Sequence, residues 1–129
     1  MTAYLLGGKT DLECPLVTVS DVIRANGLWL ENDDSTRYAV DFLKIDVERG
    51  ELAALRGIDA EHRGSIRQIA MEVHDGDGDG LRAVLDLLTA PTRDSIIGSG
   101  GFGFDTKNVI AEQPDELVGG TLWNVYARR

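Results

Sequence analysis

Apolar positions in the first quarter of the chain follow a helical spacing. Residues 17–27 have a helix signature, because Thr18 and Asp21 fit a capping box and Gly27 is suited to a C-terminal stop. The polar stretch at residues 31–37 then predicts a loop. One short amphipathic helix is therefore expected ahead of the first strand.

The spacing then changes to that of strands. The run VDFLKIDV at residues 40–47 is mostly apolar, as expected for a strand buried on both faces of a sheet. Residues 48–56 predict a helix that ends at Gly57. Residues 66–74, IRQIAMEVH, predict a second strand. One face of that strand is formed by Ile69, Met71 and Val73.

The last third of the chain contains one more helix and one more strand. Leucines and a valine recur with helical spacing over residues 81–88, and Pro91 ends this helix. A glycine-rich stretch at residues 98–103 leads into Phe104. The aromatic and β-branched residues of TLWNVYA, 121–127, predict a terminal strand. No helical pattern precedes this strand directly, which suggests an antiparallel pair at the end of the sheet.

Strands that alternate with amphipathic helices predict an α/β fold with a mainly parallel sheet. About four strands and three helices can be placed, whereas an open α/β sheet has about five to six strands. No linker divides the 129 residues. We therefore expect residues 1–129 to form one domain that is incomplete.

Composition and charge narrow the class of protein. Apolar residues make up 43% of the chain, which is ordinary for a globular domain. The formal charge of −9 argues against nucleic-acid and anionic-membrane binding, because both need a basic surface. A single cysteine, Cys14, permits no intrachain disulfide, and no signal or membrane-spanning segment is visible. A cytoplasmic protein without a nucleic-acid or membrane partner is expected.

Ionisable residues lie at the ends of both predicted parallel strands. Lys44 and Asp46 occupy the first strand and Glu48 follows it, while Glu72 and His74 end the second strand on one face. Ligands of open α/β sheets bind outside the carboxyl ends of the strands. Two interpretations remain open for this group of residues.

The first interpretation is a structural salt-bridge cluster, for instance between Lys44 and Glu72. The second is a polar wall beside a cofactor or substrate, with His74 or a carboxylate as general base. Methyl transfer to a hydroxyl needs little more, because the protein must only position the acceptor and remove its proton. A histidine next to a carboxylate suits that role.

Four ordered segments resemble a known family and cover nearly the whole chain. LKIDVERGELAALRGI, residues 43–58, resembles the signature of FkbM-type methyltransferases. PLVTVSD at 15–21 looks like the helix start that precedes it, and IRQIAMEVHD at 66–75 resembles the next strand. LWNVYARR at 122–129 looks like the last strand of members associated with polyketide and nonribosomal peptide assembly lines. In that subgroup an arginine, here Arg49, replaces the usual glycine.

The resemblance implies the C-terminal half of a Rossmann-like class I methyltransferase sheet, mainly parallel with an antiparallel final strand. It implies S-adenosylmethionine as cofactor and O-methyl transfer to a small-molecule natural product or sugar. Asp46, Glu72 and His74 would be catalytic, Asp46 and Glu48 would contact the cofactor, and Lys44 and Glu48 the substrate. No metal site is implied.

The glycine-containing turn that holds the cofactor in the family has no counterpart before Val17. The resemblance therefore implies a truncated enzyme that is not expected to be active alone. The alternative is a non-catalytic interaction module or pseudo-enzyme remnant that pairs through an exposed sheet edge. Its partner would be a second copy or a larger synthase.

Two further motifs are better explained as structural features. Residues 98–103 match G-x-G-x-x-G, but no strand-to-helix context surrounds them, so a loop is the favoured interpretation. Residues 75–80 resemble the start of a calcium loop, but position twelve is Asp86 rather than glutamate, so a turn that caps the next helix is favoured. We also expect His62 on the surface, and Trp123 and Tyr126 at the edge of the sheet.

Overall fold

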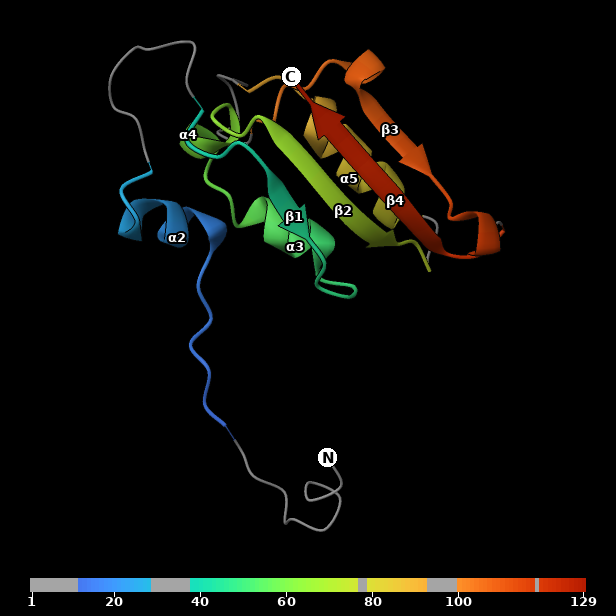
Figure 1. Ribbon diagram of the computed structural model, residues 1–129, viewed down its shortest axis with the longest axis horizontal. Helices are drawn as coiled ribbons and strands as arrows, with labels where there is room; N and C mark the ends of the chain where they lie inside the picture. The colour runs from blue at the N-terminus through green and yellow to red at the C-terminus, as the bar shows by residue number, and fades with distance from the viewer. Residues whose placement is uncertain (1–11, 29–37, 77–78, 93–99, 118) are drawn as a thin grey trace.

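The computed structural model describes residues 12–28, 38–76, 79–92, 100–117 and 119–129, and the loop predicted at 31–37 lies outside them. Within these residues one four-stranded sheet is covered on one face by helices (Figure 1). The helices are α2 (Val19–Ala25), α3 (Glu51–Arg56), α4 (Ala60–Arg63) and α5 (Gly80–Thr89). The strands are β1 (Leu43–Ile45), β2 (Gln68–His74), β3 (Val109–Glu112) and β4 (Leu122–Arg128). Short 3₁₀ turns span Thr106–Asn108 and Asp115–Leu117.

The predicted N-terminal helix is confirmed as α2. Thr18 Oγ1 accepts a hydrogen bond from the backbone N–H of Asp21, whose carboxylate accepts one from Thr18 N–H, so the capping box is present. Gly27 adopts a φ of 61°, a left-handed conformation that glycine adopts without steric cost. The helix therefore ends close to where the sequence predicts.

The strand order is β1-β2-β4-β3, with β1 parallel to β2 and β4 antiparallel to both of its neighbours. Strands β1, β2 and β3 thus run in one direction and β4 in the other. The α/β class and the antiparallel final strand are confirmed. The position expected for Trp123 and Tyr126 is wrong, because β3 pairs outside β4 and makes β4 an interior strand.

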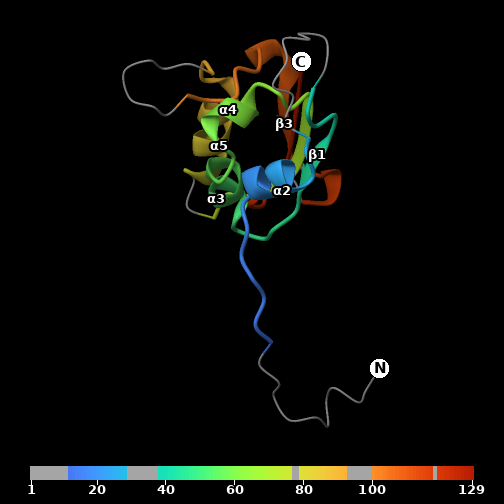
Figure 2. The same cartoon turned by 90° about the vertical axis from the view of Figure 1, so that its left-hand side faces the viewer.

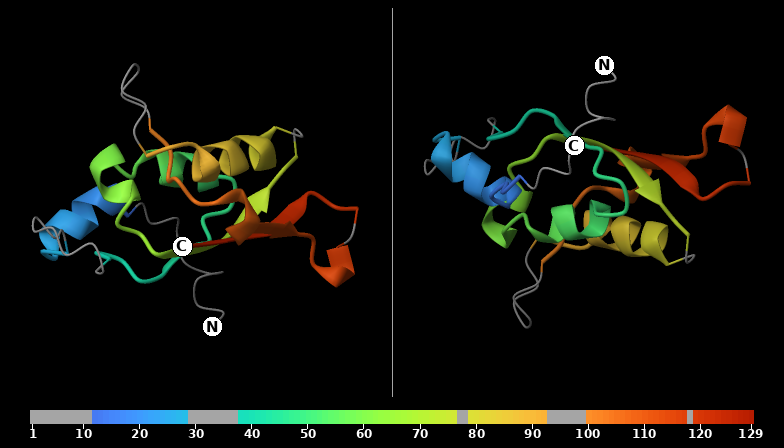
Figure 3. Two further views of the ribbon diagram at one scale, coloured as in Figure 1. Left: turned by 90° about the horizontal axis from the view of Figure 1, so that it is seen from above. Right: turned by 90° about the horizontal axis from the view of Figure 1, so that it is seen from below.

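The prediction that residues 40–47 form a strand buried on both faces is also wrong. Strand β1 is only three residues long, with Ile45 buried and Lys44 exposed. Val40 makes an isolated bridge to Ile66 instead of extending the strand. The reason is visible in Figures 2 and 3: α3, α4 and α5 all lie on one side of the sheet, and α2 lies beyond the β1 edge. Among the described residues the other face has no covering layer.

The core lies between this sheet and its helices. Ile69, Met71 and Val73 of β2 are buried on the helix side, as their spacing predicts. Val84 and Leu88 of α5 pack against them, which confirms the helix predicted at 81–88. Burial of each such side chain contributes roughly 1.5–3 kcal/mol to stability.

In the described part of the glycine-rich stretch, residues 100–102 are buried against this core and Gly103 is exposed, while residues 98 and 99 lie outside the described set. Phe102 is fully buried, and its N–H donates to the carbonyl of Leu87. A Cβ on Gly101 would lie 2.5 Å from the Leu87 and Ala90 carbonyl oxygens, so only glycine permits this approach to α5. The stretch is therefore a packing element here.

His62 contradicts its prediction. It lies in α4, a short helix that periodicity did not reveal, and is only 1% exposed. Its Nδ1 lies 2.7 Å from the hydroxyl of Ser20 on α2, so a contact distant in sequence buries it. No helix within the described residues is long and apolar enough to cross a membrane.

Candidate active site

A polar cavity of about 290 Å³ lies where β2 ends, α3 and α5 begin, and the chain enters β4. Its polar lining comes from Arg49, Glu51 and His74, and its apolar lining from Leu52, Val73 and Val84. The start of α5 closes another side at Gly80. A mixed lining of this kind, with few polar groups that converge, is typical of a small-molecule site.

The central contact of the cavity joins His74 and Glu51. The His74 Nδ1 lies 2.6 Å from Glu51 Oε1. The Glu51 side chain is 5% exposed and that of His74 is 27% exposed. Because an ionised carboxylate only accepts hydrogen bonds, Nδ1 carries the proton and donates it. No described residue hydrogen-bonds to the other ring nitrogen, Nε2.

A left-handed turn places Glu51 in this position. Glu48 and Arg49 have φ values of 36° and 69°, which side-chain-bearing residues rarely adopt. The backbone cannot continue as an α-helix through these residues, so α3 begins at Glu51 and not at Glu48 as predicted. The turn aims the N–H of Arg49 at Glu51 Oε1, 2.9 Å away. Consecutive unusual φ values next to a polar cavity are characteristic of functional sites.

The surroundings of Glu51 keep its carboxyl ionised. Burial alone would raise its pKa, but hydrogen bonds from His74 and from the backbone N–H groups of Glu51 and Arg49 lower it by more. The net effect is a pKa below its ordinary value. Glu51 is therefore a permanent anion beside His74 near neutral pH.

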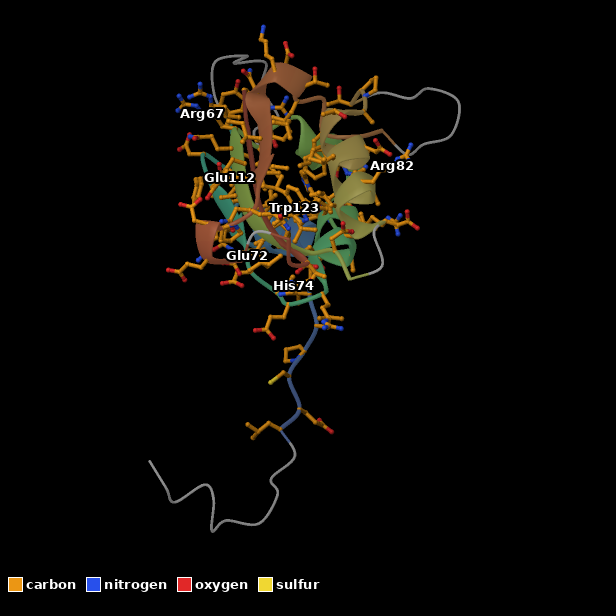
Figure 4. The ribbon with its side chains drawn as sticks, turned by 90° about the vertical axis from the view of Figure 1, so that its right-hand side faces the viewer. Arg67, Glu72, His74, Arg82, Glu112 and Trp123 are labelled. Carbon is orange, nitrogen blue, oxygen red and sulfur yellow. The ribbon has the colours of Figure 1, made fainter. Side chains whose placement is uncertain are left out.

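The other predicted site residues lie apart from this pair. Lys44 and Asp46 are exposed and form a long ion pair of 3.8 Å with each other, so the Lys44–Glu72 salt bridge suggested by the sequence is not formed. Glu48 is exposed in the left-handed turn. Figure 4 shows Glu72 on the open side of the sheet, while His74 lies at the end of β2. Within the described residues no hydrogen bond joins Glu72 to His74, whose ring contacts Glu51 instead.

Sequence reasoning therefore identified His74 but missed its partner. Glu51 lies inside the segment 43–58 that resembles the family, but the sequence predicts no role for it. A signal was available, because a glutamate that begins a helix directly after a parallel strand lies at the carboxyl end of the sheet. What the sequence lacks is the positive φ of Glu48 and Arg49, which turns that carboxylate inward.

A second polar cluster joins α2 to α4. Ser20 Oγ accepts a hydrogen bond from the Asp59 N–H, at 2.7 Å, and contacts His62. Asp59, Glu61 and His62 bring three potential metal ligands within 4.8 Å of one another. However, the Arg24 guanidinium pairs with both carboxylates. The cluster thus holds α2 against α4.

The acidic turn after β2 caps the next helix in its described part. Asp75 Oδ1 accepts a hydrogen bond from the Leu81 N–H at 3.0 Å. The Asp75 N–H donates to the Thr121 carbonyl at 2.7 Å, which ties the turn to the entry of β4. Residues 77 and 78 lie outside the described set, so the rest of the calcium-loop pattern stays a sequence observation.

Comparison with known proteins identifies distant relatives. The chain is similar to the 31-O-demethyl-FK506 methyltransferase FkbM of Streptomyces tacrolimicus, with 35% identity over 129 residues, all of this chain and 40% of that protein. It is similar to the methyltransferase sdnD of Sordaria araneosa, with 33% identity over 82 residues, 64% of this chain and 30% of that protein. It also matches the AMB antimetabolite synthetase AmbE of Pseudomonas aeruginosa, with 34% identity over 91 residues, 70% of this chain and 4% of that protein.

No protein-family model and no solved structure matches the chain. The chain spans less than half of each of these relatives. Two of the three are methyltransferases by name, and one of these matches the chain from end to end. The chain is therefore a distant homologue of methyltransferases.

Proposed function

We propose that this chain is the acceptor-side part of a domain that transfers a methyl group from S-adenosylmethionine to a hydroxyl of a natural product or sugar. The observation that carries the proposal is the His74–Glu51 pair in a cavity at the carboxyl ends of β1 and β2. The methyltransferase relatives support the reaction class. The hydroxyl acceptor follows from the O-methyl reaction in the name of the FkbM relative.

His74 is the general base of this proposal. With its Nδ1 proton committed to Glu51, the neutral ring presents Nε2 as an acceptor for the proton of the substrate hydroxyl. Glu51 is the positioning residue, because it fixes the tautomer and stabilises the imidazolium that forms. The apolar side chains Leu52, Val73 and Val84 would contact the carbon skeleton beside that hydroxyl.

The carboxylates at the end of β1 are the groups of this chain suited to the cofactor. When bound, S-adenosylmethionine supplies a methyl group already activated on a sulfonium. Asp46 and Glu48 are exposed carboxylates that can accept hydrogen bonds from its ammonium or ribose hydroxyl groups. Lys44 and Glu72 lie on the open side of the sheet and outside the cavity, so the proposal gives them no contact with the acceptor. We expect the chain alone to bind the cofactor weakly or not at all.

A chimera tests the proposal. This chain replaces the matching segment of the Streptomyces tacrolimicus FkbM protein, and methylation of 31-O-demethyl-FK506 is followed by mass spectrometry. The parent chimera is expected to methylate the compound, and His74→Ala to lower kcat by about 100- to 10,000-fold. Arg82→Gln is the matched control, since Figure 4 shows Arg82 on the outer side of α5, away from His74. A folded, cofactor-binding chimera in which His74→Ala keeps full activity would refute the assignment.

The alternative, a non-catalytic module that pairs through a sheet edge, has less support. The edge strands β1 and β3 have only three and four residues, and β1 carries the charged Lys44. Short, charged edge strands resist edge-to-edge pairing. The alternative predicts that the chimera does not methylate the compound, with or without His74→Ala.

A further inference from the structure

An apolar groove of about 540 Å³ lies beside α3, outside the candidate active site. Its lining includes Leu16 and Val17 from the segment that leads into α2, and Ala53 and Ala54 from α3. Val47, from the turn before α3, also lines it. Figure 2 shows α2 close to α3, on the side of the molecule where β1 ends the sheet.

The lining of this groove has the character of a surface that is normally covered. Among the described residues no charged side chain lines it, although 27% of the residues of the chain are charged. Leu16 is 99% exposed, Val17 60% and Val47 48%. Exposed apolar side chains gathered in this way mark a surface for another protein segment. That segment has to be apolar and uncharged, because a buried charge would find no partner along this lining.

The match to the relative from Streptomyces tacrolimicus indicates what the occupant is. All 129 residues of this chain match 40% of that protein, so more than half of the relative lies outside the match. That remainder has to contact this chain if both belong to one domain. An uncharged groove next to the edge of the sheet is suited to this contact, because the parts of one domain share a hydrophobic core.

The groove also contains both ends of the turn that positions Glu51. Val47 and Gly50 line the groove, and between them lie the two residues with positive φ, Glu48 and Arg49. A Cβ on Gly50 would lie 3.5 Å from Val47 Cγ2, so the Val47 side chain lies against Gly50 and closes the turn. A strained backbone persists where its surroundings fix it. A segment in the groove covers Val47 and so fixes this turn from the side opposite the cavity.

We propose that the groove receives an apolar, uncharged segment of the cofactor-binding part of the same domain, and that this contact holds the turn at residues 47–50 in the conformation that places Glu51 against His74. The general base is then held most firmly when the two parts of the domain are assembled. In the chain alone the turn is held less firmly, because about half of the Val47 side chain faces solvent. The proposed contact rests on the proposed function only in that the chain is one part of a larger domain.

Cysteine labelling compares the groove in the chain alone with the groove in the chimera that carries this chain within the Streptomyces protein. Leu16→Cys is expected to react with a maleimide about tenfold or more slowly in the chimera, because the docked segment covers it. Arg82→Cys, on the outer side of α5, is the matched control and should react equally fast in both proteins. Peptide mass spectrometry assigns the modified position, so the exposed Cys14 does not interfere.

Two labelling results would overturn the proposed contact. The first is equal reactivity of Leu16→Cys in the two folded proteins, because the groove would then be uncovered in both. The second is protection of Leu16→Cys already in the chain alone, because a second copy or another part of this chain would then occupy the groove.

Hydrogen exchange of the Arg49 amide tests the link to the site. This N–H donates to Glu51 Oε1 at 2.9 Å and therefore reports on the turn directly. Measured relative to the hydrogen-bonded N–H of the buried Phe102, its exchange should be about tenfold or more slower in the chimera than in the chain alone. Ala53→Asp in the chimera should return the rate toward that of the chain alone, whereas Arg56→Asp, on the same helix outside the groove, should not. Equal Arg49 rates in the two proteins would overturn the link.

A dye-binding measurement on the chain alone tests the groove even if the chimera does not fold. The dye ANS binds to exposed apolar surface and fluoresces more strongly there, so the chain is expected to bind it. Ala53→Asp should lower this fluorescence and Arg56→Asp should leave it unchanged, since both side chains are exposed and only Ala53 lines the groove. Equal fluorescence of the two variants would overturn the groove as a docking surface. None of these measurements uses methyl transfer, so an inactive chimera with a protected groove would refute only the proposed function.

Discussion

Replacing Glu51 by glutamine tests whether the charge of this side chain stabilises the cavity. Glutamine keeps the size of the side chain and one acceptor oxygen but removes the negative charge. The Glu51 carboxylate accepts hydrogen bonds from Arg49 N–H and His74 Nδ1–H at 2.9 Å and 2.6 Å. Both bonds reach the same oxygen, Oε1, which glutamine can retain, so Glu51→Gln weakens them by removing the negative charge of the acceptor.

The expected cost follows from the burial and the charge of this group. A hydrogen bond to a charged partner contributes about 1.5–3 kcal/mol, and the 5% exposure of Glu51 leaves little solvent to replace it. We therefore expect Glu51→Gln to lower the free energy of unfolding by about 1.5–3 kcal/mol at neutral pH. Glu48→Gln is the matched control, since Glu48 is exposed in the same turn, and should change stability by less than about 0.5 kcal/mol.

The pH dependence separates charge from packing. The pKa of Glu51 is lower in the folded protein than its ordinary value of 4.5. The stabilisation by its charge is therefore complete above that ordinary value and is lost as the pH falls through the lowered one. Urea denaturation of both proteins should show the difference shrinking toward zero over this acidic range. A difference that stays constant with pH would refute the role of the charge.

Three further substitutions test individual features of the fold by the same denaturation assay. Arg49→Gly should leave the free energy of unfolding unchanged or raise it by up to about 1 kcal/mol, because a φ of 69° costs an L-residue roughly that amount. A clear loss of stability would contradict backbone strain at Arg49. Gly101→Ala should lower the free energy of unfolding by about 3 kcal/mol, since its Cβ would lie 2.5 Å from backbone oxygens. Gly76→Ala, where a Cβ would meet open space, should lower it far less, and equal losses would contradict the close packing of Gly101 against α5. Ser20→Ala should lower the free energy of unfolding by about 1–3 kcal/mol, because it removes the hydroxyl that contacts His62. Amide exchange in α2 should become faster, and unchanged exchange would contradict the role of Ser20 in holding α2 against α4.

Elements with strong local signals were predictable from the sequence. The capping box of Thr18 and Asp21 gave α2, and the alternation of Ile69, Met71 and Val73 gave β2 and its buried face. The helical spacing that includes Val84 and Leu88 gave α5. In each case the periodicity of one segment already contains the information, because one face of the element packs against the core.

Features that depend on distant partners were not predictable. Strand β3 has only four residues, half of them exposed, and it is recognisable only by its pairing with β4. His62 is buried by a contact with Ser20, 42 positions away in sequence. The expectation that residues 40–47 are buried on both faces failed because the helices lie on one side only, which a single strand does not encode.

The candidate site was half predictable for the same reason. His74 stands out as a histidine at the end of a buried strand, and its position alone marks it. The position of its partner, Glu51, depends on the backbone turn at Glu48 and Arg49. Both residues have positive φ values, and because neither is a glycine the sequence does not indicate that turn. Asp46 and Glu72 are near the same end of the sheet as His74, but Asp46 pairs with Lys44, Glu72 lies on the open side, and neither lines the cavity.

The most direct test of the central claim is the kcat for methylation of 31-O-demethyl-FK506 by the chimera that carries this chain, measured with and without His74→Ala. If His74 removes the proton of the acceptor, the substitution lowers kcat by about 100- to 10,000-fold while the variant stays folded and binds the cofactor as the parent chimera does. Loss of the hydrogen bond to Glu51 lowers its free energy of unfolding by about 1.5–3 kcal/mol. Unchanged kcat in the folded His74→Ala chimera would contradict the account.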